Sequence, residues 1–157
     1  MKCAWPCLKS LETTMSIPPI ESSKVSDVAL GLDDFPVLAP TDLLKTALEQ
    51  MTAKRLGIVC IVDENGVLQG VFTDGDIRRH LLSVQRPFSA FFADDVIDHA
   101  ELDPTTVQGD ASLDEALDLM GHSRIWDLPV VDGRGHLIGL LHLHPLVNAL
   151  RQPESRA

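Results

Sequence analysis

The chain has no tyrosine, two tryptophans and only three cysteines among its 157 residues. The cysteines, Cys3, Cys7 and Cys60, are odd in number and spaced neither as a zinc site nor as a disulfide framework, which favours a reducing compartment. No apolar run approaches the roughly 18 residues that a membrane-spanning helix needs, and Pro6 interrupts the stretch 3–8, which is too short for a signal-peptide core. We therefore expect a cytoplasmic protein with no membrane role.

Basic side chains are also scarce. Thirteen Lys and Arg stand against 23 Asp and Glu, giving a formal net charge of -10. Such a surface repels phosphate backbones, which argues against a nucleic-acid partner. A small phosphorylated ligand is still compatible with this charge, because a few local cations and a helix N-terminus can bind one despite the negative charge of the whole protein.

What the sequence does contain is an internal repeat. A shift of 69 positions (116 - 47 = 69) aligns Ala47 with Ala116 and continues without a gap to Gly70, which meets Gly139. Upstream, a shift of 68 (95 - 27 = 68) pairs Asp27 with Asp95. A duplicated unit of this kind predicts copies that bury their apolar faces against each other. We divide the chain into an N-terminal flexible segment 1–23, a first repeat 24–82, a linker 83–92, a second repeat 93–151 and a C-terminal tail 152–157.

Each copy shows the pattern of a β-α-β-β-α unit. Apolar side chains recur at i, i+3, i+4 and i+7 from Leu44 and again from Leu113, which predicts helices that Thr41 and Asp110 would cap. Short β-branched runs and turn residues predict hairpins after these helices. The expected strands are 37–38, 58–62 and 67–73 in the first copy and 105–107, 128–131 and 136–142 in the second, with closing helices at 74–82 and 143–151.

These elements predict an α+β fold in which two repeats pack sheet to sheet about a pseudo-twofold axis, with clefts between them. The linker contains Phe88, Phe91 and Phe92, whose rings we expect to pack on the core.

The candidate chemistry lies at the end of the second strand of copy one, in the segment 70–79. The strand-to-helix turn there exposes backbone N–H groups suited to a phosphate, and the Thr73 hydroxyl adds a donor. The Asp76 carboxylate could accept hydrogen bonds from ribose hydroxyls, and Arg78 and Arg79 add positive charge. Thr73 and Asp76 also have the spacing of a capping box, so the alternative is that they only hold the helix start. Spacing leaves both interpretations open.

Copy two has a different sequence at this place. His142, His144 and Pro145 replace the hydroxyl and the carboxylate, so any site built this way is asymmetric. Two histidines two residues apart suggest a metal, but no third ligand is evident nearby in the sequence. We therefore predict a strand-end or capping role and no metal site.

With these residues the chain resembles a tandem CBS pair, or Bateman module. Gly70, Thr73 and Asp76 stand at the glycine-hydrophobic-hydrophobic-Thr-x-x-Asp spacing of that family. More narrowly, the segments 72–79 and 139–144 resemble the C-terminal CBS pair of arabinose-5-phosphate isomerases, sugar isomerases of the Kdo pathway. Pro145 departs from the Asp usual in those proteins. Their catalysis belongs to an N-terminal sugar-isomerase domain, for which we expect no room before Lys24, whether the chain starts at Met1 or Met15.

The resemblance implies a binding module, not an enzyme, with no required cofactor and no catalytic residue. CBS clefts accept adenosine nucleotides such as AMP or ATP, and the Kdo pathway offers a cytidine nucleotide sugar such as CMP-Kdo. By this resemblance Thr73 and Asp76 would hold phosphate and ribose. The candidate ligand-binding residues are Ile58, Cys60, Val71, Phe72, Thr73, Asp74, Asp76 and Arg78.

Three functions remain open from the sequence. The first is a regulatory module that acts as a homodimer, senses an adenine nucleotide or a nucleotide sugar, and modulates a partner such as a sugar-phosphate isomerase in trans. The second is a stand-alone or truncated member of the arabinose-5-phosphate isomerase family. The third is a structural dimerisation module that binds no ligand.

Overall fold

A computed structural model describes residues 23–83 and 85–151. The predictions made for Cys3, Cys7, the start at Met1 or Met15, the segment 1–22 and the tail 152–157 lie outside these residues. The elements in chain order are α1 (Val25–Val28), β1 (Val37–Leu38), α2 (Leu44–Lys54), β2 (Ile58–Val62), β3 (Leu68–Thr73), α3 (Asp74–Ser83), α4 (Phe88–Phe91), the 3-10 helix η1 (Val96–His99), β4 (Val107–Gln108), α5 (Leu113–Ser123), β5 (Asp127–Val131), β6 (Leu137–His142) and α6 (Leu143–Arg151). None of the helices in this part of the chain is both long and apolar enough to cross a membrane.

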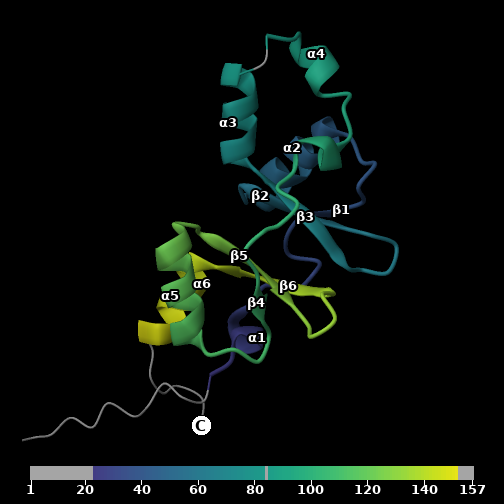
Figure 1. The fold of residues 1–157 in the computed structure, drawn as a ribbon. Coiled ribbons are helices and arrows are strands. Elements are labelled where there is room, and N and C mark those ends of the chain that lie inside the picture. Colours follow the sequence, from purple (N-terminus) through teal and green to yellow (C-terminus); the bar gives the residue numbers. More distant parts are fainter. Residues whose placement is uncertain (1–22, 84, 152–157) are drawn as a thin grey trace, which may run out of the picture.

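The two repeats form two sheets of the same topology. One has the strand order β1-β2-β3 and the other β4-β5-β6, each with a parallel first pair and an antiparallel hairpin. The hairpins also share their register, because Ile58 lies opposite Thr73 and Asp127 lies opposite His142. Figure 1 shows the sheets at the centre of the molecule, with α2 and α3 on one outer side and α5 and α6 on the other. The predicted α+β fold of two packed β-α-β-β-α repeats is confirmed.

The alternation of strand residues divides the core into layers. On β2, Val59 and Ile61 pack under the helices of the first repeat, whereas Ile58 and Cys60 face the second repeat. The layer between the sheets also contains Leu140 from β6. A lone three-stranded sheet could not cover both faces, so this shared layer makes the two repeats one structure.

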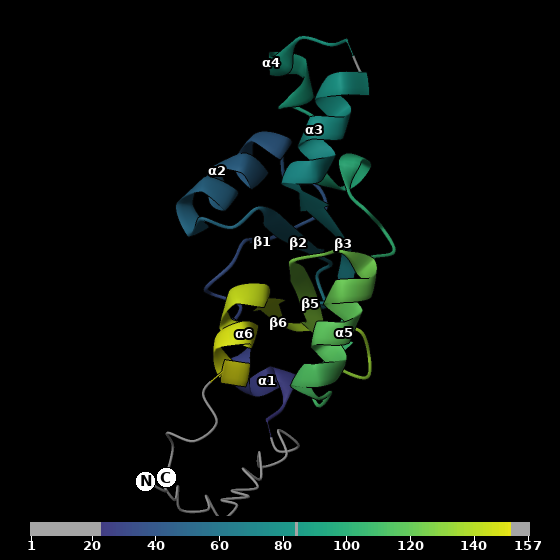
Figure 2. The same ribbon diagram turned by 90° about the vertical axis from the view of Figure 1, so that its left-hand side faces the viewer.

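The segments that lead into the repeats are exchanged. α1 precedes the first repeat but lies on the second, as both ribbon views show (Figures 1 and 2). Val25 is fully buried in the second repeat's core, and its N–H donates to the Ala111 carbonyl at 3.0 Å. Reciprocally, Val96 of η1 is fully buried in the first repeat's core and donates to the Asp42 carbonyl at 2.8 Å.

This exchange corrects the upstream register of the repeat. Leu30 exchanges two backbone hydrogen bonds with Leu140, and Glu101 does the same with Val71. Leu30 and Glu101 are therefore equivalent, with a shift of 71 (101 - 30 = 71) instead of the predicted 68. The prediction was wrong because the loops leading to β1 and β4 differ in length, so that chance matches, Asp27-Val28 with Asp95-Val96 and Pro36 with Pro104, set the frame.

Both predicted helix caps were also wrong. α2 begins after Leu43 with no side-chain cap, because the Leu44 N–H donates to the Asp94 carbonyl at the start of the second repeat at 3.0 Å. α5 is capped by the Ser112 hydroxyl, which accepts from the Glu115 N–H at 3.2 Å. Thr41 and Asp110 lie too far before these helices to cap them.

The linker folds back onto the first repeat. Phe91 is buried in that core and Phe92 packs against it, as expected. Phe88 differs, since it is 60% exposed at the start of α4.

The exchange makes a testable prediction about local stability. Val25→Ala should expose the second repeat to local opening, because a buried side chain of that core is lost at a cost of about 2 kcal/mol. Hydrogen exchange should then show lower protection of the Leu128 and Leu141 amides than of the Val59 and Phe72 amides. Val96→Ala is the matched control and should reverse the pattern. Equal loss of protection in both repeats for both variants would contradict the exchange.

Candidate functional site

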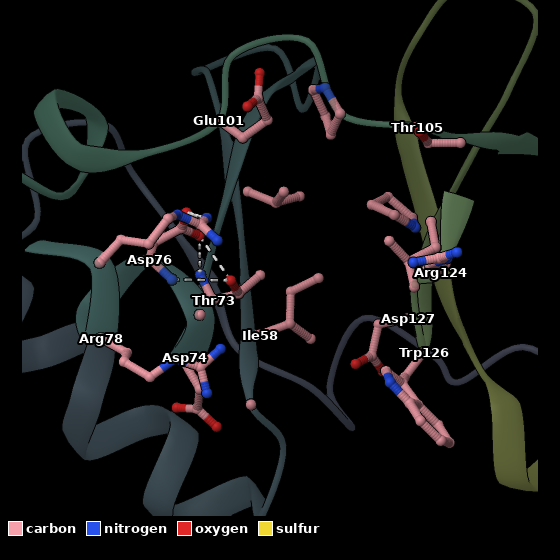
Figure 3. A pocket seen from close by; sticks show the side chains of 17 residues that line it. Ile58, Thr73, Asp74, Asp76, Arg78, Glu101, Thr105, Arg124, Trp126 and Asp127 are labelled. Atoms are coloured by element: carbon pink, nitrogen blue, oxygen red, sulfur yellow. Dashed lines mark hydrogen bonds and ion pairs between the residues drawn. The ribbon is translucent and has the colours of Figure 1, made fainter. Parts of the chain in front are cut away.

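A cleft of about 570 Å³ lies between the repeats, within the size range of small-molecule sites. One wall comes from the end of β3 and the start of α3, and the facing wall comes from the segment that enters β5. Figure 3 shows these walls across the cleft from each other, with Glu101 and Thr105 of the second repeat along one edge. Both repeats therefore contribute to a single site.

Six of the eight predicted site residues line this cleft. They come from the strand ends and from the first turns of α3, and they are Ile58, Val71, Thr73, Asp74, Asp76 and Arg78.

Cys60 and Phe72 do not line the cleft, which corrects their assignment. Phe72 is fully buried, and strand alternation turns it to the helix side between Val71 and Thr73. Cys60 faces the other repeat but lies deeper along β2, where it is also fully buried. Burial raises the pKa of its thiol far above the ordinary range, and the charge of Asp127 raises it further.

Thr73 and Asp76 form a capping box at the start of α3. The Thr73 N–H and hydroxyl donate to Asp76 Oδ2 at 2.8 and 2.7 Å. In return the Asp76 N–H donates to Thr73 Oγ1 at 3.4 Å, and Arg79 pairs with the other carboxylate oxygen. The two interpretations left open by the sequence are thus compatible, because the same side chains fasten the helix and line the cleft.

The second repeat has a contact between a histidine and a carboxylate in place of this capping pair. His142 stands at the position of Thr73 (142 - 73 = 69) and Asp127 at that of Ile58 (127 - 58 = 69). His142 Nδ1 lies 2.7 Å from Asp127 Oδ1. His142 ends β6, the strand-end position expected for it. Across residues 23–83 and 85–151, no three His, Cys, Asp or Glu side chains gather as a metal site.

The facing wall was not predicted from the sequence. Arg124, Trp126 and Asp127 line the cleft there, and Arg124 ends α5 with a positive φ of 54°, as Arg55 ends α2 at 56°. A signal for this wall was present, because Trp126 replaces Gly57 in the repeat (126 - 57 = 69). Where one copy changes from glycine to a large aromatic side chain, the symmetry predicts a local difference in surface.

Charges of both signs line the cleft. Arg78, Arg79 and Arg124 are cationic, whereas Asp74, Asp76, Glu101 and Asp127 are anionic. The first turn of α3 adds the partial positive charge of its N–H groups. This arrangement suits a ligand that combines one anionic group with several hydrogen-bonding groups, more than it suits a polyanion.

The burial of Cys60 gives a second prediction. In a Cys3→Ser, Cys7→Ser variant, Ellman's reagent should label the native protein about 100-fold more slowly than protein unfolded in guanidinium chloride. Because the pKa is raised, labelling of the folded-state thiol should keep rising with pH beyond the usual thiol pKa of about 8.5, where labelling of the unfolded thiol levels off. Rapid labelling of the folded variant would show that Cys60 is accessible from the cleft after all.

The CBS domain family model matches the chain twice, at residues 25–83 and 94–151. An uncharacterised protein of Helicobacter pylori strain J99 is 38% identical over 125 residues, covering 79% of this chain and 36% of that protein. The arabinose 5-phosphate isomerase KdsD of Escherichia coli strain K12 is 34% identical over 126 residues, covering 80% of this chain and 37% of the isomerase. The chain thus spans little more than a third of the length of these relatives.

Solved structures have the same fold. CBSX2 in complex with AMP is 29% identical with a TM-score of 0.72, covering 82% of this chain and 96% of that one. A second structure of CBSX2, from Arabidopsis thaliana, is 27% identical with a TM-score of 0.71, covering 82% and 94%. The CBS pair of MJ0100, in complex with 5-methylthioadenosine and S-adenosyl-L-methionine, is 20% identical with a TM-score of 0.67, covering 82% and 96%. At that identity, this last similarity concerns the fold alone.

Proposed function

The chain belongs to the CBS-domain family, and we propose that it is a regulatory module that binds a nucleotide-type ligand in the cleft between its repeats. The observation that carries the proposal is the cleft itself, in which the capping pair Thr73 and Asp76 faces residues of the other repeat. The similarity to CBSX2, whose structure contains AMP, supports the same ligand class.

The cleft suggests a place for each part of a nucleotide. A phosphate would bind at the start of α3, where the helix N-terminus and Arg78 provide positive charge. Ribose hydroxyls would donate to Asp76, and the base would pack on Ile58 and Val71. The capping bonds leave Asp76 acceptor capacity, since a carboxylate offers about four lone-pair sites and three protein donors reach it. AMP, ATP and a cytidine nucleotide sugar such as CMP-Kdo are the candidate ligands.

Regulation follows from a ligand held by both repeats at once. A ligand shifts a conformational equilibrium only by its differential affinity for the two states, and a site shared between two bodies is sensitive to their relative position. We propose that the chain works as a homodimer and that its partner is a sugar-phosphate isomerase. The support for this partner is the similarity to KdsD, of which the chain spans 37%.

Ligand binding is tested by thermal shift with AMP, ATP, CMP and CMP-Kdo. At 100-fold excess over its Kd, a ligand selective for the folded state stabilises it by about 2.7 kcal/mol, which raises the Tm by about 5 to 10 °C. Asp76→Ala should abolish this shift, although it also lowers the Tm of the free protein through loss of the cap.

Ser112→Ala is the matched control for that variant. It removes a helix cap of the second repeat that does not line the cleft, so it should lower the Tm but leave the ligand-induced shift intact. An unchanged shift in Asp76→Ala would overturn the site assignment. No shift with any of the four ligands would favour the purely structural dimerisation module.

The regulatory role predicts no turnover by the chain itself. Purified protein incubated with arabinose 5-phosphate should form no ribulose 5-phosphate. When the chain is added to a full-length arabinose 5-phosphate isomerase, it should change the rate of that conversion only if the ligand identified by thermal shift is present. The Asp76→Ala variant should leave the rate unchanged under the same conditions. Turnover by the chain alone would support the alternative of an isomerase.

A further inference from the structure

The facing wall of the cleft presents an exposed aromatic ring. Trp126 is 68% exposed and lines the cleft across from Thr73 and Asp74 (Figure 3). Large apolar side chains exposed in a concave, mixed-polarity site mark a surface that becomes covered by a ligand. We therefore expect a planar apolar group of a ligand to cover the indole inside the cleft.

The backbone fixes Trp126 while leaving its ring free. Its carbonyl accepts from the Leu143 N–H at the start of α6, at 2.9 Å. Trp126 also lines a second hollow of about 300 Å³, together with the apolar residues Leu117 and Met120. The indole can thus settle against a flat ring without any movement of the backbone that carries it.

Asp127 places a carboxylate next to this ring. Its side chain is largely buried at the start of β5 and lines the cleft. His142 holds Oδ1 at 2.7 Å, and within the described part of the chain Oδ2 receives no hydrogen bond from the protein. An ionised carboxylate accepts hydrogen bonds and repels phosphate, so this side of the cleft selects a ligand group that donates.

We propose that Trp126 and Asp127 form a specificity wall for the base of the nucleotide. The indole stacks on a heteroaromatic ring, and Asp127 Oδ2 accepts a hydrogen bond from an amino group on that ring. This inference rests on the proposed function and narrows its ligand class to nucleotides whose base carries an exocyclic amino group, as do the adenine and cytosine of the candidate ligands. The phosphate then lies at the opposite wall, with the helix N-terminus of α3.

The test compares ligands that differ only in the amino group. The probes are AMP against purine riboside 5′-monophosphate and CMP against pyrimidin-2-one riboside 5′-monophosphate, titrated by calorimetry into the full chain. For at least one pair, the aminated nucleotide should bind about tenfold or more tightly, as expected for a hydrogen bond to a charged group. In Trp5→Phe protein, the same ligand should also change the fluorescence of Trp126, then the only indole.

Variants separate the two parts of the wall. Asp127→Ala should bring the two members of the pair to within about twofold of each other, by weakening the aminated ligand alone. Asp127→Asn, which preserves the shape of β5, should reduce the discrimination to about threefold, because the charge is lost. Trp126→Ala should weaken both members by a similar factor of about ten and leave their ratio unchanged.

Matched controls lie outside the cleft. Asp132→Ala removes a carboxylate that pairs with His136 at 2.9 Å in the same repeat, and Phe88→Ala removes another exposed aromatic side chain. Both should leave the affinities and their ratio unchanged. Equal affinity within each pair for the wild-type chain, or discrimination that persists in Asp127→Ala, overturns the specificity wall while leaving the proposed function intact. Binding of neither AMP nor CMP overturns the proposed function and the wall with it.

Discussion

The exchange of leading segments between the repeats is the constraint on which the rest of the structure depends. Leu30 forms two backbone hydrogen bonds with Leu140, and Glu101 forms two with Val71, so each sheet is completed by chain that belongs in sequence to the other repeat. Buried backbone groups without partners are costly, which makes separation of the repeats unfavourable beyond the loss of their shared apolar layer. The geometry of the cleft depends on these hydrogen bonds, since Val71 lies on one of its walls and Glu101 along its edge.

The duplication supplies the scaffold, and its departures from symmetry supply the chemistry. Both repeats present a strand end followed directly by a helix, at Thr73 and at His142. The first repeat satisfies its helix start with a hydroxyl and a carboxylate, whereas the second joins His142 to Asp127. The replacement of Ile58 by Asp127 puts a charge on the wall that faces Thr73. One cleft thereby receives polar groups from both repeats that an exact duplication would not have provided.

Much of the fold could be predicted from the sequence, because local patterns specify it. The 3.6-residue stripe of α2 and the glycine-bearing turn before β3 each depend on neighbouring residues only, and both elements lie where they were expected. The exchange of α1 could not be predicted in this way, since its buried Val25 would satisfy either core and only tertiary packing selects one. The cap of α2 failed for a related reason, because α2 receives its first hydrogen-bond acceptor from Asp94, far away in sequence. The Ser112 cap of α5 is instead a local signal that was missed.

The residues of the candidate site could likewise be predicted only where a local sequence pattern specifies them. Thr73 and Asp76 could be predicted as candidates because a helix start and its capping pair form a local motif, and the structure shows that motif at the cleft. Cys60 and Phe72 were misplaced because the sequence pattern of an apolar residue next to a motif is the same whether the side chain faces a ligand or the core. Which of the two it faces depends on the alternation of side chains along the strand. Trp126 and Asp127 come from the other repeat, so no spacing around Thr73 contains them. The lining of a cleft between two copies therefore has to be predicted from both copies together. Its ligand selectivity is expected at the positions where the two copies carry different residues.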